Sequence, residues 1–294
     1  MTDSACPMCG STRSIKIIEH DSSFLAQFYE DLYKVDVTRF LPEPVVGTYR
    51  CTDCDLKVHR PALPGDSNFY DEMQKFPFYY EESKPEFTYA VNQVLKMNPA
   101  SILEMGCGSG KFLKKISTAF NVKGSEHSQK SIEILQQTGI SLDTPSDTYD
   151  FICSFQVLEH VEDVNGFLTT ATEKLHDGGH LLVTVPNNDS KYYQERFGIL
   201  DYPPHHLTQW SRKALYSIAD IFGLTVVEYY EEPLRIEHYQ ALIKSRRKSI
   251  SKGKIKTLVA KIAGIILDGV ITPYMIDMVN YPGHTHGILL RKDQ

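Results

Sequence analysis

Short apolar runs bounded by glycine, proline or polar residues recur along this chain from residue 101 onward. Their length of five to seven residues fits buried β-strands rather than helices. We predict strands at residues 101–105, 122–126, 149–155, 181–187, 224–230 and 286–292. Segments 111–120 and 211–222 carry apolar residues at helical spacing. Alternation of buried strands with amphipathic helices predicts an α/β domain.

The first predicted strand runs directly into a glycine-rich turn, reading SILEMGCGSGKF over residues 101–112. The pattern E-x-G-x-G-x-G consists of Glu104, Gly106, Gly108 and Gly110. Glycines let a ligand approach the backbone, and the helix that follows offers unpaired N–H groups. The dinucleotide fingerprint G-x-G-x-x-G fails, because its third glycine would fall on Lys111. The turn therefore predicts a site for an adenosine-bearing ligand other than a dinucleotide, against the alternative of a tight turn alone.

The glycine spacing resembles motif I of class I S-adenosylmethionine-dependent methyltransferases. Two later segments extend the resemblance in the same order. The strand at 122–126 ends in Glu126, where a carboxylate accepts both ribose hydroxyls, and the strand at 149–155 leads into QVLEHV at 156–161, similar to motif IV and its V-L-E-H helix start. The resemblance covers residues 70–292. It implies a Rossmann-like α/β fold with a seven-stranded mixed sheet, an antiparallel last strand, and S-adenosylmethionine as cofactor.

Ligands of open α/β sheets bind at the carboxyl ends of the strands. On the resemblance, the cofactor-binding residues are Glu104, Gly106, Cys107, Gly108, Gly110, Glu126, His127, Asp143, Phe155 and Gln156. For Glu126, the alternative is an ordinary surface acid at a strand end.

Methyl transfer to a hydroxyl requires that the protein align the acceptor and remove its proton. Two places offer a base. One is His160 beside Glu159, and the other is the pair His205 and His206 in PPHHLTQW. Acceptor contacts are predicted at Tyr79 and Tyr80 of the aromatic segment 68–87, and at Asn187 and Tyr202. Aromatic packing between neighbouring parts of the chain is the alternative for that segment.

The segment Q-x-x-E-H with a distal histidine also resembles the E-x-x-E-H site that binds a divalent metal in small-RNA 2′-O-methyltransferases and some quinone-pathway O-methyltransferases. Gln156 replaces the first acid, which removes one charge from a site for a hard cation. Three interpretations stay open: a histidine base without metal, a divalent metal in the cleft, and histidines that merely pack while Glu159 caps a helix.

Four cysteines form two C-x-x-C pairs near the amino terminus: Cys6, Cys9, Cys51 and Cys54. Thiolates at this spacing in a reducing compartment favour a structural zinc ion, with a redox dithiol as the alternative. We predict a zinc-binding lobe over residues 1–66 and a methyltransferase domain over 67–294. The arrangement resembles the amino-terminal half of sugar C-methyltransferases that act on nucleotide-linked keto sugars, but this chain has one methyltransferase domain only.

The net charge of −6 argues against general binding of nucleic acid. A basic run at 244–256 is the exception, and a solvated surface or a site for a polyanion, a diphosphate or a membrane surface would explain it. Residues 1–10 lack a secretory signal, and the apolar stretch 257–275 is interrupted by charges and proline. These features predict a cytoplasmic enzyme without a membrane partner.

Together, these features predict methyl transfer from S-adenosylmethionine to a hydroxyl of a small molecule, with a sugar or nucleotide-linked sugar as the expected acceptor. One alternative is an RNA methyltransferase that grips its substrate with the zinc lobe and residues 244–256. Another is a non-catalytic module that binds S-adenosylmethionine or a partner. Residues 231–284 are predicted as a helical insert serving as a lid, a dimer surface or an acceptor site. The sequence does not select an oligomeric state.

Overall fold

The computed structural model describes residues 5–76, 84–194, 198–236, 238 and 282–293. Its larger sheet has the strand order β10-β11-β8-β7-β4-β5-β6. The strands are β4 (Ile102–Met105), β5 (Val122–Ser125), β6 (Ser141–Leu142), β7 (Tyr149–Phe155), β8 (Leu175–Pro186), β10 (Leu224–Pro233) and β11 (Pro282–Lys292). Strand β11 pairs antiparallel with both β8 and β10, whereas β4, β5, β6, β7 and β8 pair in parallel. The predicted seven-stranded mixed sheet is confirmed.

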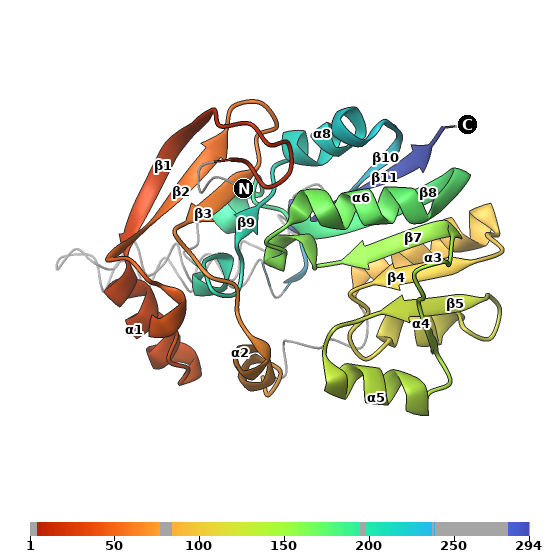
Figure 1. Cartoon of the computed structure of the whole chain (residues 1–294), viewed down its shortest axis with the longest axis horizontal. Coiled ribbons are helices and arrows are strands. Elements are labelled where there is room, and N and C mark those ends of the chain that lie inside the picture. The colour runs from red at the N-terminus through yellow and green to blue at the C-terminus, as the bar shows by residue number, and fades with distance from the viewer. Residues whose placement is uncertain (1–4, 77–83, 195–197, 237, 239–281, 294) are drawn as a thin grey trace, which may run out of the picture.

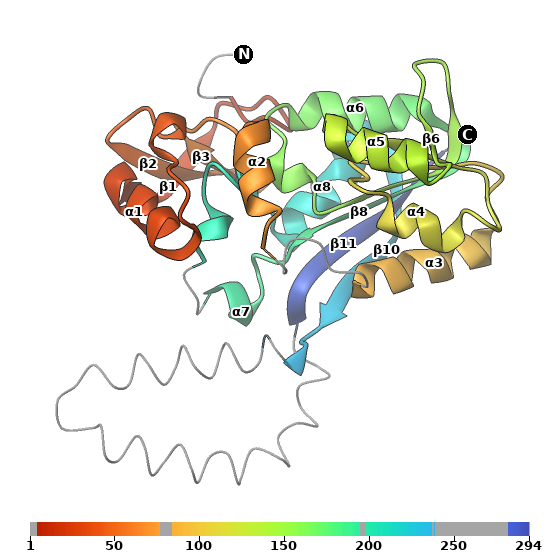
Figure 2. The same ribbon diagram turned by 90° about the horizontal axis from the view of Figure 1, so that it is seen from below.

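Helices cover both faces of this sheet (Figure 2). Helices α6 (Val164–Lys174) and α8 (Arg212–Phe222) pack on one face, and α3 (Pro85–Met97), α4 (Lys111–Ile116) and α5 (Gln129–Gln137) contribute to the core on the other. The central strands are buried on both faces, which explains their continuous apolar sequence. Helix α8 begins where the Ser211 hydroxyl accepts the Ala214 N–H, and it ends at left-handed Gly223.

A second, four-stranded sheet is formed by three strands of the amino-terminal part of the chain and one later strand (Figure 1). Its strands are β1 (Ser14–Asp21), β2 (Val45–Cys51), β3 (Lys57–Arg60) and β9 (Thr208–Gln209), all paired antiparallel. Beside it lie α1 (Ser22–Tyr33), the short helix η1 (Thr38–Phe40) and α2 (Ser67–Met73). We call residues 5–66 the N-terminal lobe. Because β9 belongs to the chain beyond β8, a strand of the α/β domain completes the sheet of this lobe.

One hydrophobic cluster contains residues of both the N-terminal lobe and the α/β domain. Cys51, Cys54 and Leu56 are buried in the same cluster as Trp210 of the β9–α8 connection and Ala214 of α8. The division at residue 66 stays a prediction, but the two parts pack as a continuous interior rather than across a solvated gap.

Several predicted elements differ in extent. Helix α4 is shorter than the predicted 111–120, because the amides of Ala119 and Phe120 both donate to the Ile116 carbonyl and tighten the chain into a turn. The V-L-E-H segment forms the short helix η2 (Leu158–His160), and α6 starts only at Val164, where Asp163 caps it. Helix α1 had no counterpart among the predicted elements. Two further short helices are α7 (Lys191–Gln194) and η3 (Ile199–Asp201).

Strands β10 and β11 are longer than predicted and reduce the connection between them to residues 234–281. Most of this insert, including the basic run 244–256, lies outside the described residues, as do Tyr79 and Tyr80. Within the described part of the chain, no helix has both the length and the apolar character needed to cross a membrane.

Candidate active site

A cavity of about 590 Å³ opens at the carboxyl ends of β4, β5 and β7. It brings together most of the residues predicted for the cofactor and for catalysis. These are Glu104, Gly106, Cys107, Gly108, Glu126, Phe155, Gln156, Glu159, His160, His205 and His206. The cavity also reaches Phe28, Leu32 and Tyr33 of α1, so the N-terminal lobe forms part of its wall.

The glycine turn after β4 requires glycine at specific positions. Gly106 has φ +74°, and a Cβ there would lie 2.6 Å from Cγ2 of Val157. Gly110 has φ +72° at the start of α4, where a Cβ would lie 2.6 Å from Leu135. Both positions combine a left-handed backbone with a close neighbour. The turn can therefore expose its backbone to a ligand at the cavity wall.

Two carboxylates flank this turn. Glu126 is fixed by three backbone amides, since its Oε1 accepts the N–H groups of His127 and Ser128 and its Oε2 accepts that of Gly108 at 2.8 Å. Glu104 is buried, which raises the pKa of its carboxyl, and its Oε2 has no hydrogen-bond partner among the described residues. An orphaned buried acceptor in a cavity wall fits a ligand that carries a donor or positive charge. That this pair contacts the ammonium and ribose groups of S-adenosylmethionine stays a prediction.

Three histidines meet at the other part of the cavity. His160 comes from η2, and His205 and His206 come from the loop before β9; their ring centroids lie 4.5–4.9 Å apart. We call these three residues the histidine cluster. His160 Nδ1 lies 2.5 Å from the His205 carbonyl oxygen, and His205 Nδ1 lies 3.1 Å from that of Leu200. A carbonyl oxygen only accepts, so Nδ1 carries the proton in both rings and each Nε2 keeps a lone pair.

Burial controls the charge of this cluster. It lowers the pKa of His160 to about 4 and holds those of His205 and His206 well below their usual range. The adjacent carboxyl of Glu159 is also buried, which raises its pKa to about 8. Its Oε1 lies 3.9 Å from His160 Nε2. At neutral pH the imidazoles are therefore neutral proton acceptors.

Five predicted site residues are not among the described residues that line the cavity: Gly110, His127, Asp143, Asn187 and Tyr202. Asp143 accepts from the Tyr149 hydroxyl and from Lys174 Nζ instead. The Tyr202 hydroxyl lies 3.1 Å from His20 Nε2 in the N-terminal lobe. Their roles, like those of Tyr79 and Tyr80, stay predictions.

Other residues at the site were missed from the sequence. Tyr70 of α2 packs edge-on against His160, with ring centroids 5.9 Å apart, although it is not among the described residues that line the cavity. Asp201 lines the cavity and directs Oδ1 toward His206 Nδ1 at 3.8 Å. Lys84, Glu86, Glu232 and Arg235 also line it. No local motif marks these residues, because only packing brings them to the cavity.

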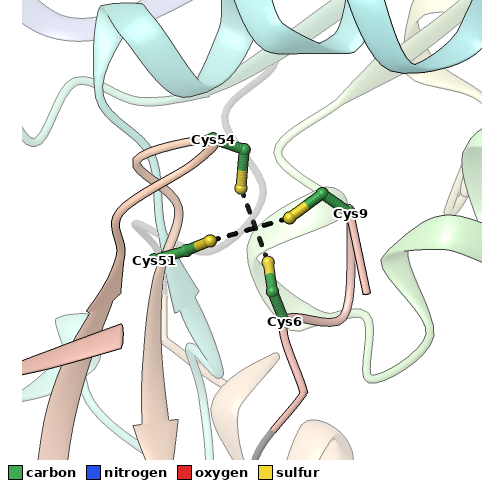
Figure 3. Close-up of side chains that lie close together, drawn as sticks. All are labelled: Cys6, Cys9, Cys51 and Cys54. Atoms are coloured by element: carbon green, nitrogen blue, oxygen red, sulfur yellow. Dashed lines mark hydrogen bonds between the residues drawn. The ribbon is translucent and has the colours of Figure 1, made fainter. Parts of the chain in front are cut away.

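The four cysteines of the N-terminal lobe point toward one another (Figure 3). The sulfur atoms of Cys6 and Cys54 lie 3.5 Å apart and those of Cys9 and Cys51 3.6 Å apart, and all four are free thiols. A zinc ion with four thiolates at about 2.3 Å would set sulfurs about 3.8 Å apart. Each pair is followed by a residue with positive φ, Gly10 and Asp55, whose N–H returns to the first cysteine of its pair. The geometry fits a closed tetrahedral metal site.

Comparison with known proteins identifies the family. Residues 80–229 match the family described as "Methyltransferase domain". The chain belongs to this methyltransferase family. That span contains the glycine turn, Glu126 and His160, and the predicted S-adenosylmethionine-dependent methyltransferase is confirmed.

Named relatives of this methyltransferase are matched over a limited region. Ubiquinone biosynthesis O-methyltransferases of Rhizobium johnstonii and Paramagnetospirillum magneticum are 29% identical over 105 residues. The match covers 31% of this chain and 42% of each relative's length.

Solved structures cover more of the chain at lower identity. A SAM-dependent methyltransferase from Archaeoglobus fulgidus has a TM-score of 0.48 and 14% identity, covering 77% of this chain and all of its own. One from Mesorhizobium loti has a TM-score of 0.45 and 15% identity, covering 68% of this chain and 96% of its own.

Proposed function

We propose that this methyltransferase methylates a hydroxyl group of a small molecule, with the histidine cluster providing the base. The observation that carries the proposal is the histidine cluster itself, buried, uncharged and in the same cavity as the glycine turn. The names of the matched relatives, which are O-methyltransferases, support oxygen as the acceptor atom. The resemblance of the N-terminal lobe to sugar-modifying enzymes supports a sugar or nucleotide-linked sugar as the acceptor.

Bound S-adenosylmethionine supplies an electrophilic methyl group. The chain contributes alignment and proton removal. Glu126 holds the ribose, and Glu104 accepts from the ammonium group. His160 takes the acceptor proton at Nε2, because the His205 carbonyl keeps the proton of that ring on Nδ1. Proton transfer to Nε2 places a positive charge 3.9 Å from the Glu159 carboxyl, which favours the ionised form of that carboxyl.

The same geometry supports a second role for the histidine cluster. Its three potential ligand atoms all lie within 4.8 Å of one another, close enough to surround a divalent metal ion. Neutral imidazoles suit zinc and other transition metals. Such an ion would bind the acceptor hydroxyl and lower its pKa. Metal content distinguishes the two roles, because a metal-free base needs no ion beyond the one at the cysteines.

For the four cysteines, we infer a structural zinc ion that ties the start of the chain to β2. The sulfur spacing supports this ion, and a closed site leaves no position for a substrate. One equivalent of zinc per chain supports the cysteine site alone, and two equivalents support both sites. Loss of the second equivalent in His206→Ala would assign it to the histidine cluster.

The decisive experiment has two steps. Calorimetry with S-adenosylmethionine, S-adenosylhomocysteine and NAD should show binding of the first two only. Release of S-adenosylhomocysteine is then followed with sugars, nucleotide sugars, other hydroxyl compounds, amines and RNA. Methylation of a hydroxyl compound that is lost in His160→Ala, with cofactor binding intact, supports the proposal. Turnover on amines or RNA alone, or full activity of His160→Ala, would refute it.

A further inference from the structure

The loop that carries His205 and His206 is hydrogen-bonded to the N-terminal lobe at several points. We call residues 198–207 the histidine loop. Tyr29 of α1 donates its hydroxyl to the Tyr202 carbonyl at 2.9 Å, and the Gly65 N–H donates to the Pro204 carbonyl at 3.0 Å. Strand β3 then pairs with β9 directly after the loop. A loop of the α/β domain is thus bonded along its length to another part of the chain.

His59 of β3 is at the centre of these contacts. It is 3% exposed and bonded at three atoms. Its backbone N–H donates to the Leu207 carbonyl at 3.0 Å, and its Nε2 lies 3.1 Å from the Asp201 carbonyl oxygen. Its Nδ1 lies 3.0 Å from the Thr48 hydroxyl. Because the carbonyl of Asp201 only accepts, Nε2 carries the proton and Nδ1 accepts from Thr48.

His59 is hydrogen-bonded to the carbonyls of Asp201 and Leu207, and His205 and His206 lie between these two residues in the chain. Between them the His205 carbonyl accepts the hydrogen bond of the His160 Nδ1–H. The Asp201 carboxylate faces His206 Nδ1 at 3.8 Å. The Leu207 N–H in turn donates to the Glu159 carbonyl at 2.8 Å. A shift of the Asp201 backbone would therefore displace the histidine cluster relative to the glycine turn.

We propose that His59 is a positioning residue, through which the N-terminal lobe fixes the histidine cluster for methyl transfer. His59 itself is absent from the described lining of the cavity, so it acts through the histidine loop. The proposal rests on the proposed function of the cluster. It makes catalysis by the α/β domain dependent on a buried residue of the N-terminal lobe. Misplacement of a catalytic group by about 1 Å lowers rates by about 100-fold.

Two neutral variants of similar size separate positioning from packing. His59→Gln places an amide N–H near the position of Nε2 and can keep the bond to Asp201. His59→Asn places its amide near the position of Nδ1, keeps contact with Thr48 and cannot reach Asp201. The full chain is used for both variants, and urea unfolding checks that each is folded.

The first readout is hydrogen exchange at the amides of His206 and Leu207, which donate to Tyr202 and Glu159. We expect exchange to be about tenfold faster in His59→Asn and close to wild type in His59→Gln. The second readout is the ring nitrogen spectrum of histidine-labelled protein, in which His160 should lose its single Nδ1–H tautomer in His59→Asn alone. With an acceptor found in the screen, kcat should fall about 10- to 100-fold in His59→Asn, with the Kd for S-adenosylmethionine within twofold of wild type.

Equal behaviour of the two variants in exchange and ring spectra would overturn the proposal, because a packing role does not distinguish the two amide positions. Unchanged kcat in a variant with faster exchange would overturn it as well. If the proposed function is wrong, the wild type will not methylate any of the hydroxyl compounds, and this outcome is distinct from those of the two variants. The exchange and ring spectra need no acceptor, so they test the positioning in either case.

Discussion

Replacing Gly106 by alanine tests how the glycine turn is built. The added Cβ meets two independent obstacles. One is the left-handed backbone, since φ is +74°. The other is Val157, whose Cγ2, Cγ1 and Cβ would lie 2.6, 3.0 and 3.4 Å from the new atom. Gly139 offers a matched control, because its φ is +75° and a Cβ there has no atom within 4 Å.

The magnitudes separate the two obstacles. An alanine in the left-handed conformation lowers the free energy of unfolding by about 1–2 kcal/mol, and we expect this loss in both Gly106→Ala and Gly139→Ala. Overpacking against Val157 adds about 1–3 kcal/mol to Gly106→Ala only. The substitution Val157→Ala removes both Cγ atoms, so in the double variant it should recover the overpacking loss but not the backbone loss. The turn also borders the cofactor site, so Gly106→Ala should raise the Kd for S-adenosylmethionine about tenfold or more while Gly139→Ala leaves it unchanged.

Urea unfolding of the wild type, Gly106→Ala, Val157→Ala and the double variant with both changes gives the coupling energy between the two positions directly, and Gly139→Ala is measured beside them. Calorimetry gives the Kd for the cofactor in each. Equal losses of unfolding free energy at Gly106 and Gly139, together with no recovery in the double variant, would show that Val157 does not restrict the turn. An unchanged Kd in Gly106→Ala would show that the turn is not the cofactor site.

Three further outcomes are expected. Glu126→Gln removes a charged acceptor that three amides orient, and its Kd for S-adenosylmethionine in calorimetry should rise about 10- to 100-fold; an unchanged Kd would contradict the ribose role. Burial lowers the pKa of His59 from 6.5 to about 3, so its contribution to stability is full above pH 6.5 and is lost as the pH falls. Between neutral pH and pH 5, the free energy of unfolding measured with urea should fall by about 2 kcal/mol more in the wild type than in His59→Gln. Equal decreases in the two proteins would disprove this assignment. Cys51→Ser should lose its zinc in elemental analysis and several kcal/mol of unfolding free energy, whereas wild-type zinc content in this variant would exclude the cysteine site.

Several residues predicted for the cofactor line one cavity, and the sequence could indicate this grouping because its determinants are local. The alternating glycines mark positive φ angles within one turn, and Glu104 and Glu126 each stand at or near the end of their own strand. The ends of adjacent parallel strands lie at one edge of a sheet, so strand order alone brings these residues together. The extent of α4 and the η2 form of V-L-E-H could not be predicted, since tertiary contacts decide where a helix ends.

Local patterns in the amino-acid sequence specify most strands of the α/β domain, helix α8, the glycine turn and the two cysteine pairs, because backbone geometry and ligand spacing within a few residues are enough to mark them. The packing of the folded chain makes α1 a cavity wall, adds β9 to the sheet of the N-terminal lobe, and brings His59 against the loop of His205 and His206. These contacts join residues far apart in the chain. Their geometry follows from how the two sheets pack, which no local pattern encodes.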